Sequence, residues 1–409
     1  MLRIAFYNHT GTVSGAEGML LLGLSRLPRN AFDPVLICPE TGTLAAAAAE
    51  RGIPVYSGPA VVARFTWNPV LLIRYIALLL SGLWGLRGTI RRLQPDIIHA
   101  NTVRAGIAST LATAGMKVPI IWHNHDMLPS SHPVTLGIRF LIWASGRVRV
   151  VACSAAAANT LRPISRRQPQ PTVIYNGCNV DRTKPEQPER AQKRAEIDVA
   201  LGQFVIAKVG QITPRKGQLE LIQAFSRVKT HIPHAVLVLC GSPLFDHDRG
   251  YLDRLYEETE KLALNRSVRF LGHRKDAVDI VGAADLCILN SSREPFALTI
   301  VEAMAIGTPV VATDCGGPSE AIRHGIDGEI VPVGDPDALV RTIVRLAADP
   351  ALRQKYAATG ELSVKQRFSR EQYIRRWCTV YEETDIASRQ LAQHPGRPVD
   401  LQIDSGASR

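Results

Sequence analysis

Short apolar stretches alternate with longer stretches of helix-like spacing along almost the whole chain, and this alternation limits the folds open to it. The strand candidates of the first half are residues 2–7, 34–38, 97–100, 119–122, 148–153 and 172–175. Those of the second half are residues 204–209, 235–240, 268–271, 286–289, 309–312 and 329–333. Strands that alternate with helices form parallel, doubly wound sheets. The predicted fold class is α/β, with two Rossmann-like domains whose sheets face a cleft.

Length and composition support two domains. The chain has 409 residues and 46% hydrophobic content, which is enough for two cores. A polar stretch at 181–193, rich in Pro, Glu, Gln and Arg, separates the two series of strands. The predicted domains are therefore residues 1–182 and 183–369. Residues 390–409 are polar and contain Pro, Gly and Ser, so we expect a disordered tail there.

The cysteines and the amino terminus bear on the compartment. Seven cysteines are scattered without CxxC pairs, and several lie in apolar runs, as Cys153 and Cys287 do. This pattern is typical of reduced core thiols. The amino-terminal apolar run turns polar after six residues, which indicates a first strand and not a signal peptide. The predicted location is the cytoplasm.

The positive charge of the chain is concentrated in the first half. The net charge is +11, and residues 1–182 contain 18 Lys and Arg against 7 Asp and Glu, whereas residues 183–409 contain 30 of each. The apolar stretch 70–86 contains Arg74 and is followed by Arg87, Arg91 and Arg92. It is too short to span a bilayer comfortably, but such a helix can lie at the surface of an anionic leaflet. The alternative is a buried amphipathic helix with solvated arginines. Nucleic acid is disfavoured, because the arginines are not interleaved with aromatic residues.

Two glutamates eight residues apart form the most informative motif. Pro295 disfavours helical geometry at Glu294, whereas Glu302 lies in a run with helical spacing. A loop carboxylate can accept hydrogen bonds from sugar hydroxyls, and a helical carboxylate two turns on can hold a ribose diol. The backbone N–H groups of residues 296–298, namely Phe296, Ala297 and Leu298, can bind a phosphate. The alternative is that Glu294 caps a helix and Glu302 is an exposed charge.

A basic turn follows the strand candidate 204–209. Arg215, Lys216 and Gly217 precede a helical stretch, where the two cations can neutralise a diphosphate and the glycine permits close backbone approach. The spacing is not that of a Walker loop. The alternative is an ordinary solvent-facing turn. In the first loop of the chain, glycines at 11, 15 and 18 have the wrong spacing for a dinucleotide fingerprint but allow a phosphate or sugar to approach. The alternative for this loop is an ordinary turn between a strand and a helix.

Two histidines end the strand candidate 119–122. Alternation directs His123 and His125 to the same side. A metal is disfavoured because no nearby Cys or third His completes a ligand set. We expect one imidazole to hydrogen-bond a substrate, and the alternative is a structural histidine.

These motifs together resemble the family 4 retaining glycosyltransferases of the two-domain GT-B type. The resemblance extends from residue 3 to about residue 383 and rests on the E-x7-E pair Glu294 and Glu302. The supporting motifs are Lys216-Gly217, Ser14-Gly15-Ala16-Glu17, His125-Asp126, Asn176-Gly177 and Gly316-Gly317-Pro318-Ser319-Glu320. The resemblance implies that a final helix, residues 370–389, packs back on the first domain.

The resemblance also implies a role for each site residue. Glu294 contacts the transferred sugar, Glu302 the ribose and Lys216 the diphosphate. Gly15 contacts the donor phosphates or the acceptor, His125 lies near the reacting carbon, and Arg274 falls in the base-binding loop. One position departs from the family pattern, because Gln211 stands where the family usually has Arg. Gln brings no charge, so Arg215 or another arginine has to compensate.

The expected reaction is retaining transfer of a hexose from a nucleoside-diphosphate sugar to an acceptor hydroxyl. Neither a metal nor another cofactor is expected. The basic first half suggests a lipid-linked or anionic acceptor glycan of bacterial cell-surface polysaccharide synthesis, reached at the inner face of the membrane. The alternatives are a GT-B epimerase or phosphorylase, and a non-catalytic subunit that binds nucleotide sugars.

Overall fold

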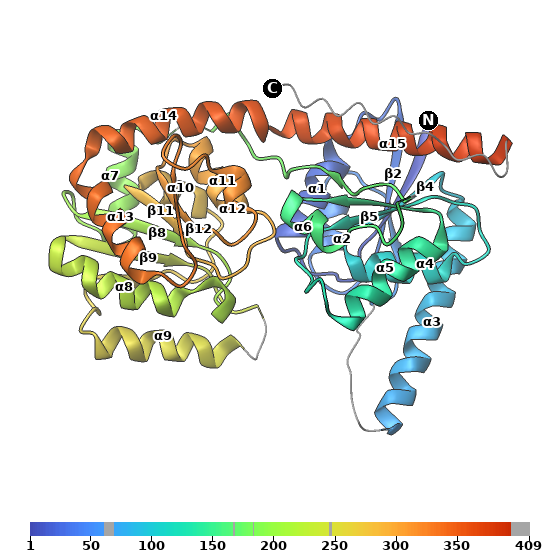
Figure 1. Ribbon diagram of the computed structural model, residues 1–409, viewed down its shortest axis with the longest axis horizontal. Helices are drawn as coiled ribbons and strands as arrows, with labels where there is room; N and C mark the ends of the chain where they lie inside the picture. The colour runs from blue at the N-terminus through green and yellow to red at the C-terminus, as the bar shows by residue number, and fades with distance from the viewer. Residues whose placement is uncertain (61–68, 167, 183, 245–247, 394–409) are drawn as a thin grey trace. The chain divides into compact units, whose positions relative to one another are not determined.

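The computed structural model describes residues 1–60, 69–166, 168–182, 184–244 and 248–393 (Figure 1). The chain divides into two compact units. Unit 1 comprises Met1–Cys153, Ala157–Ile174 and Tyr373–Arg409, and unit 2 comprises Ser154–Ala156 and Tyr175–Gln372. Each unit contains its own parallel sheet. The prediction of two doubly wound α/β domains is confirmed.

The sheet of unit 1 has seven parallel strands in the order β3-β2-β1-β4-β5-β6-β7. The strands are β1 (Leu2–Tyr7), β2 (Phe32–Cys38), β3 (Val55–Ser57), β4 (Ile97–Ala100), β5 (Ile120–Asn124), β6 (Val148–Ala152) and β7 (Thr172–Val173). The helices are α1 (Gly15–Arg26), α2 (Leu44–Ala49), α3 (Pro69–Leu93), α4 (Val103–Ala112), α5 (Pro133–Ser145), α6 (Ala155–Thr160, which begins in unit 2) and α15 (Arg370–Gln393). Strand β4 is buried along its whole length, as expected where helices cover both faces of a sheet.

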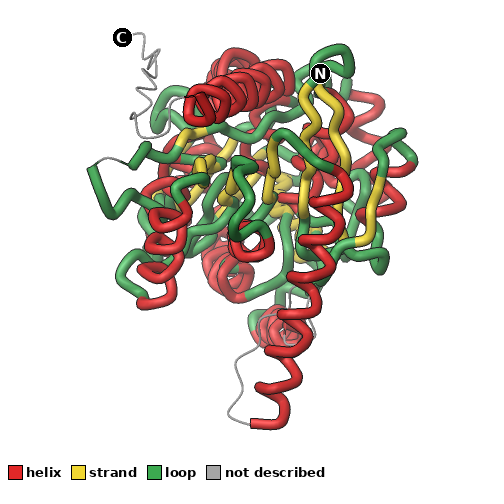
Figure 2. Tube along the Cα trace, turned by 90° about the vertical axis from the view of Figure 1, so that its right-hand side faces the viewer, coloured by secondary structure: helices red, strands yellow, loops and turns green. Residues whose placement is uncertain are grey.

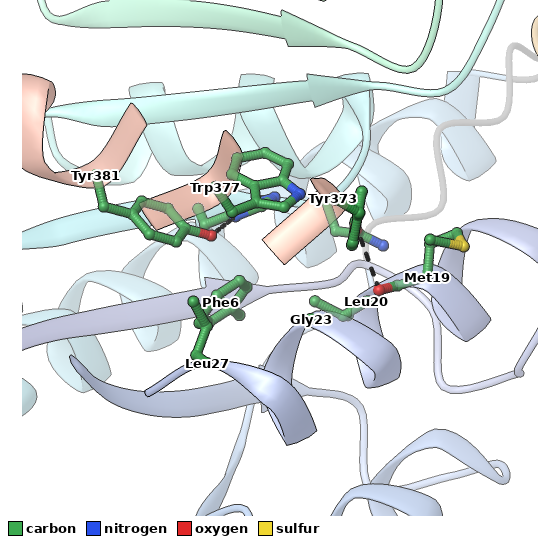
Figure 3. Close-up of a pocket in the computed structure, with 10 residues that line it drawn as sticks. Phe6, Met19, Leu20, Gly23, Leu27, Tyr373, Trp377 and Tyr381 are labelled. Carbon is green, nitrogen blue, oxygen red and sulfur yellow. Dashed lines mark hydrogen bonds between the residues drawn. The ribbon is translucent and has the colours of Figure 1, made fainter. Parts of the chain in front are cut away.

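Helix α15 completes the core of unit 1 (Figure 3). The aromatic side chains of Tyr373, Trp377 and Tyr381 are each at most 3% exposed and point toward β1 and α1. The Tyr381 hydroxyl shares a hydrogen bond of 2.7 Å with His99 Nδ1, and the Tyr373 hydroxyl donates to the Met19 carbonyl at 3.4 Å. Large aromatic side chains bury much apolar surface, so this helix contributes strongly to the stability of the unit.

The sheet of unit 2 has six parallel strands in the order β10-β9-β8-β11-β12-β13. The strands are β8 (Phe204–Val209), β9 (Ala235–Cys240), β10 (Val268–Phe270), β11 (Leu286–Leu289), β12 (Val310–Thr313) and β13 (Glu329–Val331). The helices are α7 (Gln187–Glu196), α8 (Gln218–His231), α9 (Arg249–Lys261), α10 (Ala277–Ala283), α11 (Leu298–Ala305), α12 (Pro318–Ala321), α13 (Pro336–Ala348) and α14 (Pro350–Arg367), with a 3-10 turn η1 (Pro214–Lys216). In the core, residues such as Phe225 of α8 and Ile343 of α13 pack on Ile206 of β8.

Three local features differ from the sequence predictions. Helix α7 lies inside the polar stretch that we expected to be a linker, because Glu186 and Glu189 cap it and Arg194 pairs with Asp285 at 2.8 Å. Strand β3 was not predicted, since three half-exposed edge residues show no apolar pattern. Helix α15 runs to Gln393, so residues 390–393 are helical; residues 394–409 of the predicted tail lie outside the described residues.

All seven cysteines are free thiols, and six of them are buried, as predicted.

The apolar stretch 70–86 of unit 1 lies within α3. In α3, Leu86, Ile90 and Leu93 are buried in the core of unit 1, whereas Leu78, Leu80 and Trp84 are exposed. The amino-terminal part of α3 projects from the rest of unit 1 (Figures 1 and 2). Within the part of the chain that the structure describes, no helix is long and apolar enough to cross a membrane.

Candidate functional site

The candidate site lies where the strand order of unit 2 reverses. Strands β8 and β11 are neighbours, and the chain winds outward from them in opposite directions. Ligands of open parallel sheets bind beyond the carboxyl ends of the strands at such a point. Turn η1, which carries Lys216, directly follows β8, and the loop that carries Glu294 follows β11. The fold therefore brings together two predicted residues that are 78 positions apart.

Glu294 is the centre of a compact charged cluster. Its side chain is buried, and its Oε2 atom accepts a hydrogen bond from Lys216 Nζ at 2.5 Å and from Ser291 Oγ at 3.3 Å. The guanidinium of Arg215 lies 3.5 Å from the same oxygen and donates to the Arg293 carbonyl at 2.7 Å. Two cations thus face one carboxylate, so the cluster has a surplus positive charge that an anionic ligand can neutralise.

The loop of Glu294 is fixed by the glycine pair after β12. The Glu294 amide donates to the Cys315 carbonyl at 3.1 Å, and the Gly317 amide donates to the Glu294 carbonyl at 2.8 Å. A Cβ atom on Gly317 would lie 2.5 Å from the Pro295 carbonyl oxygen, which is closer than van der Waals contact allows. Glycine at this position is therefore a packing requirement, and it holds the Glu294 backbone in place.

The start of α11 offers two of the three predicted amides. The Leu298 amide donates to the Phe296 carbonyl at 3.0 Å, so its prediction as a free donor is wrong. The local cause is a tight turn before the first helical residue. Phe296 and Ala297 are buried, and their amides donate to no other residue in the described part of the chain. Unpaired amides at a helix amino terminus favour an anion.

Glu302 lies in α11, as predicted, with Glu294 in the preceding loop. Its carboxylate makes no hydrogen bond or ion pair with the residues that the structure describes, although Arg182 and Arg370 are near enough to influence it. Burial raises the pKa of Glu302 to about 7, and the two arginines oppose that shift. A half-buried carboxylate without a partner is a ready acceptor for hydroxyl groups.

Gln211 and Arg274 are both tied to acidic side chains. Gln211 Nε2 donates to Asp248 Oδ2 at 3.1 Å. Arg274 holds Asp276 in a bidentate pair, with distances of 2.8 and 2.7 Å, and this pair lowers the pKa of Asp276. Within the described residues, neither side chain makes a hydrogen bond or an ion pair with the Glu294 cluster. Each follows the carboxyl end of a strand of the same parallel sheet, β8 for Gln211 and β10 for Arg274, which keeps both on the ligand edge of the sheet.

Lys208 was not identified from the sequence. It lies in β8 and is 4% exposed, and its Nζ atom donates to Asn290 Oδ1 at 2.6 Å. Burial lowers the pKa of Lys208 to about 7. A lysine inside the apolar run Phe-Val-Ile-Ala-Lys-Val was a signal that could have been read, because lysine is rarely fully buried without a partner.

Gly15 of unit 1 begins helix α1. It is exposed, and a Cβ atom there would meet nothing within 4 Å. The neighbouring Glu17 is buried and closes a capping box with Ser14, accepting from the Ser14 amide at 3.1 Å. The fold itself therefore does not require glycine at position 15, and the open space at this helix terminus can admit a ligand.

Half-buried His125 ends a row of imidazoles whose other members, His99 and His123, are buried. The ring centroids of His123 and His125 lie 3.8 Å apart, which confirms that the two side chains point the same way, and those of His99 and His123 lie 5.4 Å apart. Burial lowers the pKa of His125 to about 4, so the ring is neutral at physiological pH. His125 Nε2 and both nitrogens of His123 have no partner in the described residues. No set of three metal-ligating side chains occurs within the described residues.

Each half of the chain matches a family profile of glycosyltransferases. The family profile Glycosyltransferase Family 4 matches residues 13–182, and the profile Glycosyl transferases group 1 matches residues 189–362. The chain is 28% identical to lipopolysaccharide core biosynthesis glycosyltransferase LpsD of Rhizobium meliloti over 88% of this chain and 93% of the relative. It is 30% identical to D-inositol 3-phosphate glycosyltransferase of Salinispora arenicola over 71% and 69%.

A solved structure of a related protein has the same fold over almost the whole chain. Anabaena HepE in complex with UDP and glucose superposes with a TM-score of 0.78 at 25% identity, covering 93% of this chain and 100% of HepE. The similarity includes both Rossmann-like units. The chain belongs to glycosyltransferase family 4 and is a glycosyltransferase with the GT-B fold.

Proposed function

We propose that the protein transfers a hexose from a nucleoside-diphosphate sugar to an acceptor hydroxyl with retention of configuration. The observation that carries this proposal is the Lys216–Glu294 pair at the point where the strand order of unit 2 reverses, together with the unpartnered Glu302 of α11. The donor diphosphate would bind Lys216 and the amides of Phe296 and Ala297. Glu302 would accept hydrogen bonds from the ribose. HepE, which has the same fold, binds UDP and glucose.

Neutralising the leaving diphosphate is the main catalytic task in this proposal. Negative charge grows on the diphosphate as the glycosidic bond breaks, and preorganised cations and amides stabilise it. Glu294 holds Lys216 at 2.5 Å in the free protein, so a bound donor would share the ammonium with this carboxylate. Glu294 then positions the sugar, and neutral His125 contributes a hydrogen bond near the reacting carbon. No metal is required for these roles.

The proposed acceptor is a membrane glycolipid or lipid-linked glycan. LpsD acts in lipopolysaccharide core biosynthesis. Unit 1 exposes large apolar side chains on two helices, namely Leu78, Leu79, Leu80 and Trp84 of α3 and Val134, Leu136, Phe140 and Trp143 of α5. We call these residues the apolar surface of unit 1. Arg74 of α3 is also exposed. Apolar side chains flanked by arginines suit the interface of an anionic leaflet, which supports the proposal that the protein works at the inner face of the membrane.

A donor screen tests the first part of the proposal. Thermal unfolding is measured with UDP-, GDP- and ADP-sugars, because a ligand that binds only the folded protein raises its stability by RT ln(1 + [L]/Kd). Turnover with the selected donor is then measured for Lys216→Met, Glu294→Gln and Glu302→Gln. Unchanged turnover in these variants would remove the assigned roles. Product analysis separates the alternatives: an epimerase needs no acceptor, and a non-catalytic subunit binds the donor without transfer or hydrolysis.

Vesicle binding tests the membrane contact. We expect the protein to sediment with vesicles that contain phosphatidylglycerol at low salt, and Leu78→Asp to reduce that binding. The matched control is Leu362→Asp, since Leu362 of α14 is 60% exposed and Leu78 is 58% exposed. Equal binding of the two variants would argue against the apolar surface of unit 1 as the membrane contact.

A further inference from the structure

Lys208 is a buried cation that the proposed reaction does not yet use. Among the described residues, Asn290 is its only hydrogen-bond partner, at 2.6 Å. An ammonium group has three donors, so two N–H groups of Lys208 make no hydrogen bond to the described chain. A buried charge with incomplete pairing lowers stability, and such groups are concentrated at functional sites.

Asn290 connects Lys208 to the turn that carries Lys216. Asn290 accepts from Lys208 through Oδ1 and donates through Nδ2 to the Gly217 carbonyl at 2.5 Å. Gly217 has φ +68°, and a Cβ atom on it would lie 2.4 Å from the Asn290 carbonyl oxygen. The turn therefore rests closely on Asn290, and Lys208 fixes the orientation of the Asn290 carboxamide.

Lys208 adds a positive charge to a site in which Lys216 and Arg215 already face Glu294. Gln211 is neutral and donates to Asp248, and the charge of Lys216 is shared with Glu294. Lys208 is within electrostatic reach of the same pair, since Lys216 lowers its pKa and Glu294 raises it. A cation at this depth acts through a medium of low polarity, where its effect on a nearby anion is larger than in water.

We propose that Lys208 is a positioning residue of the donor site, which holds the Lys216–Gly217 turn through Asn290 and supplies the positive charge that Gln211 lacks. This inference rests on the proposed function, because it concerns the binding of the same diphosphate.

The proposal has a pH signature. Burial lowers the pKa of Lys208 to about 7, and the titratable groups that influence it are Lys216, Glu294, Cys287 and Cys315. A bound diphosphate favours the charged ammonium, so binding takes up a proton and the contribution of Lys208 falls as pH rises above about 7. Glu302 acts in the opposite direction, because it ionises over the same range and accepts ribose hydroxyls better when charged. Glu302 is the same in wild type and in a Lys208 variant, so the ratio of their UDP affinities at each pH reports the contribution of Lys208 alone.

The test compares UDP binding by wild type and Lys208→Met at pH 6.5 and pH 8.5, with calorimetry and with the full-length protein. We expect UDP affinity to fall about tenfold at pH 6.5, where Lys208 is largely protonated and the variant loses its positive charge. At pH 8.5 Lys208 is largely neutral, so we expect a loss of only about twofold. Affinity for uridine, which has no diphosphate, stays unchanged. The control is Lys229→Met. Lys229 donates to the carbonyl of Ala235, the first residue of β9, and so lies at the edge of the sheet opposite to the ligand edge.

Two further variants keep the result interpretable. Lys208→Gln retains an N–H donor for Asn290 without the charge, and we expect it to lose the pH dependence as Lys208→Met does. Adding Gln211→Arg to Lys208→Met should restore most of the UDP affinity. Equal UDP affinity in wild type and Lys208→Met, or an equal loss for UDP and uridine at both pH values, would overturn the inference alone. Failure of the wild type to bind UDP, GDP or ADP would instead remove the proposed function and this inference with it.

Discussion

Replacing Glu302 with glutamine should stabilise the protein at high pH while it weakens donor binding. The pKa of Glu302 is raised by burial from 4.5 to about 7. Between these two values the unfolded chain releases the proton and the folded protein keeps it, so stability falls as pH rises through this range. At 1.36 kcal/mol per pKa unit, the ionised side chain costs about 3 kcal/mol above pH 7. Glutamine does not ionise, so Glu302→Gln should recover most of this amount at pH 8 and nothing below pH 4.5.

Chemical denaturation at pH 4.5, 6 and 8 measures this effect. Residues 175–372 of unit 2 contain no tryptophan, and Trp84, Trp122, Trp143 and Trp377 lie in unit 1. Tryptophan fluorescence therefore follows unit 1, whereas far-ultraviolet circular dichroism follows both units. The control is Glu257→Gln on the exposed surface of α9, which should change stability little at any pH. UDP affinity should fall by about tenfold or more in Glu302→Gln, because hydrogen bonds from the ribose to a charged acceptor are lost. A stability difference that does not change between pH 4.5 and pH 8 would refute the reasoning.

Three further substitutions have distinct expected outcomes. Gly15→Ala should leave the unfolding temperature equal or slightly higher, since no atom lies near the added methyl group and alanine favours the helix, but it should reduce turnover by at least about tenfold; Gly18→Ala in the same helix, also in open space, should retain turnover. Gly317→Ala should destabilise unit 2 by about 1–3 kcal/mol and reduce turnover, because its methyl group meets the Pro295 carbonyl; Gly250→Ala, with no neighbour within 4 Å, is the control for denaturation. Lys216→Met should lower kcat about 100-fold or more by removing charge stabilisation of the leaving diphosphate, and a normal kcat with a raised KM would contradict a role in the transition state.

Local chemistry made much of unit 2 predictable. Strands β8, β9 and β11 have the bounds that their apolar runs indicated. Pro295 separated the loop carboxylate of Glu294 from the helical carboxylate of Glu302. One local error had a local cause, because the Leu298 amide turns back onto the Phe296 carbonyl.

Long-range partners were beyond the reach of the sequence. The hydrogen bond between Lys208 and Asn290 joins residues 82 positions apart, and that between His99 and Tyr381 joins residues 282 positions apart. Both hydrogen bonds depend on the order of the strands and on where a helix packs. A residue pattern predicts the fold class but not which side chains the fold brings together. The buried lysine in an apolar strand was visible in the sequence, but its partner was not.

Helix α15 belongs to unit 1 but follows every strand of unit 2 in the sequence, so unit 1 is completed last during synthesis. Tyr373, Trp377 and Tyr381 fill the core of unit 1, yet the ribosome makes them after every strand of both sheets. A nascent chain can close unit 2 while unit 1 still exposes the apolar side chains of β1 and α1, such as Phe6 and Leu20, that α15 later covers. Expression of the amino-terminal half alone would leave those side chains open to aggregation, whereas a fragment that supplies the last helix in trans should rescue its solubility.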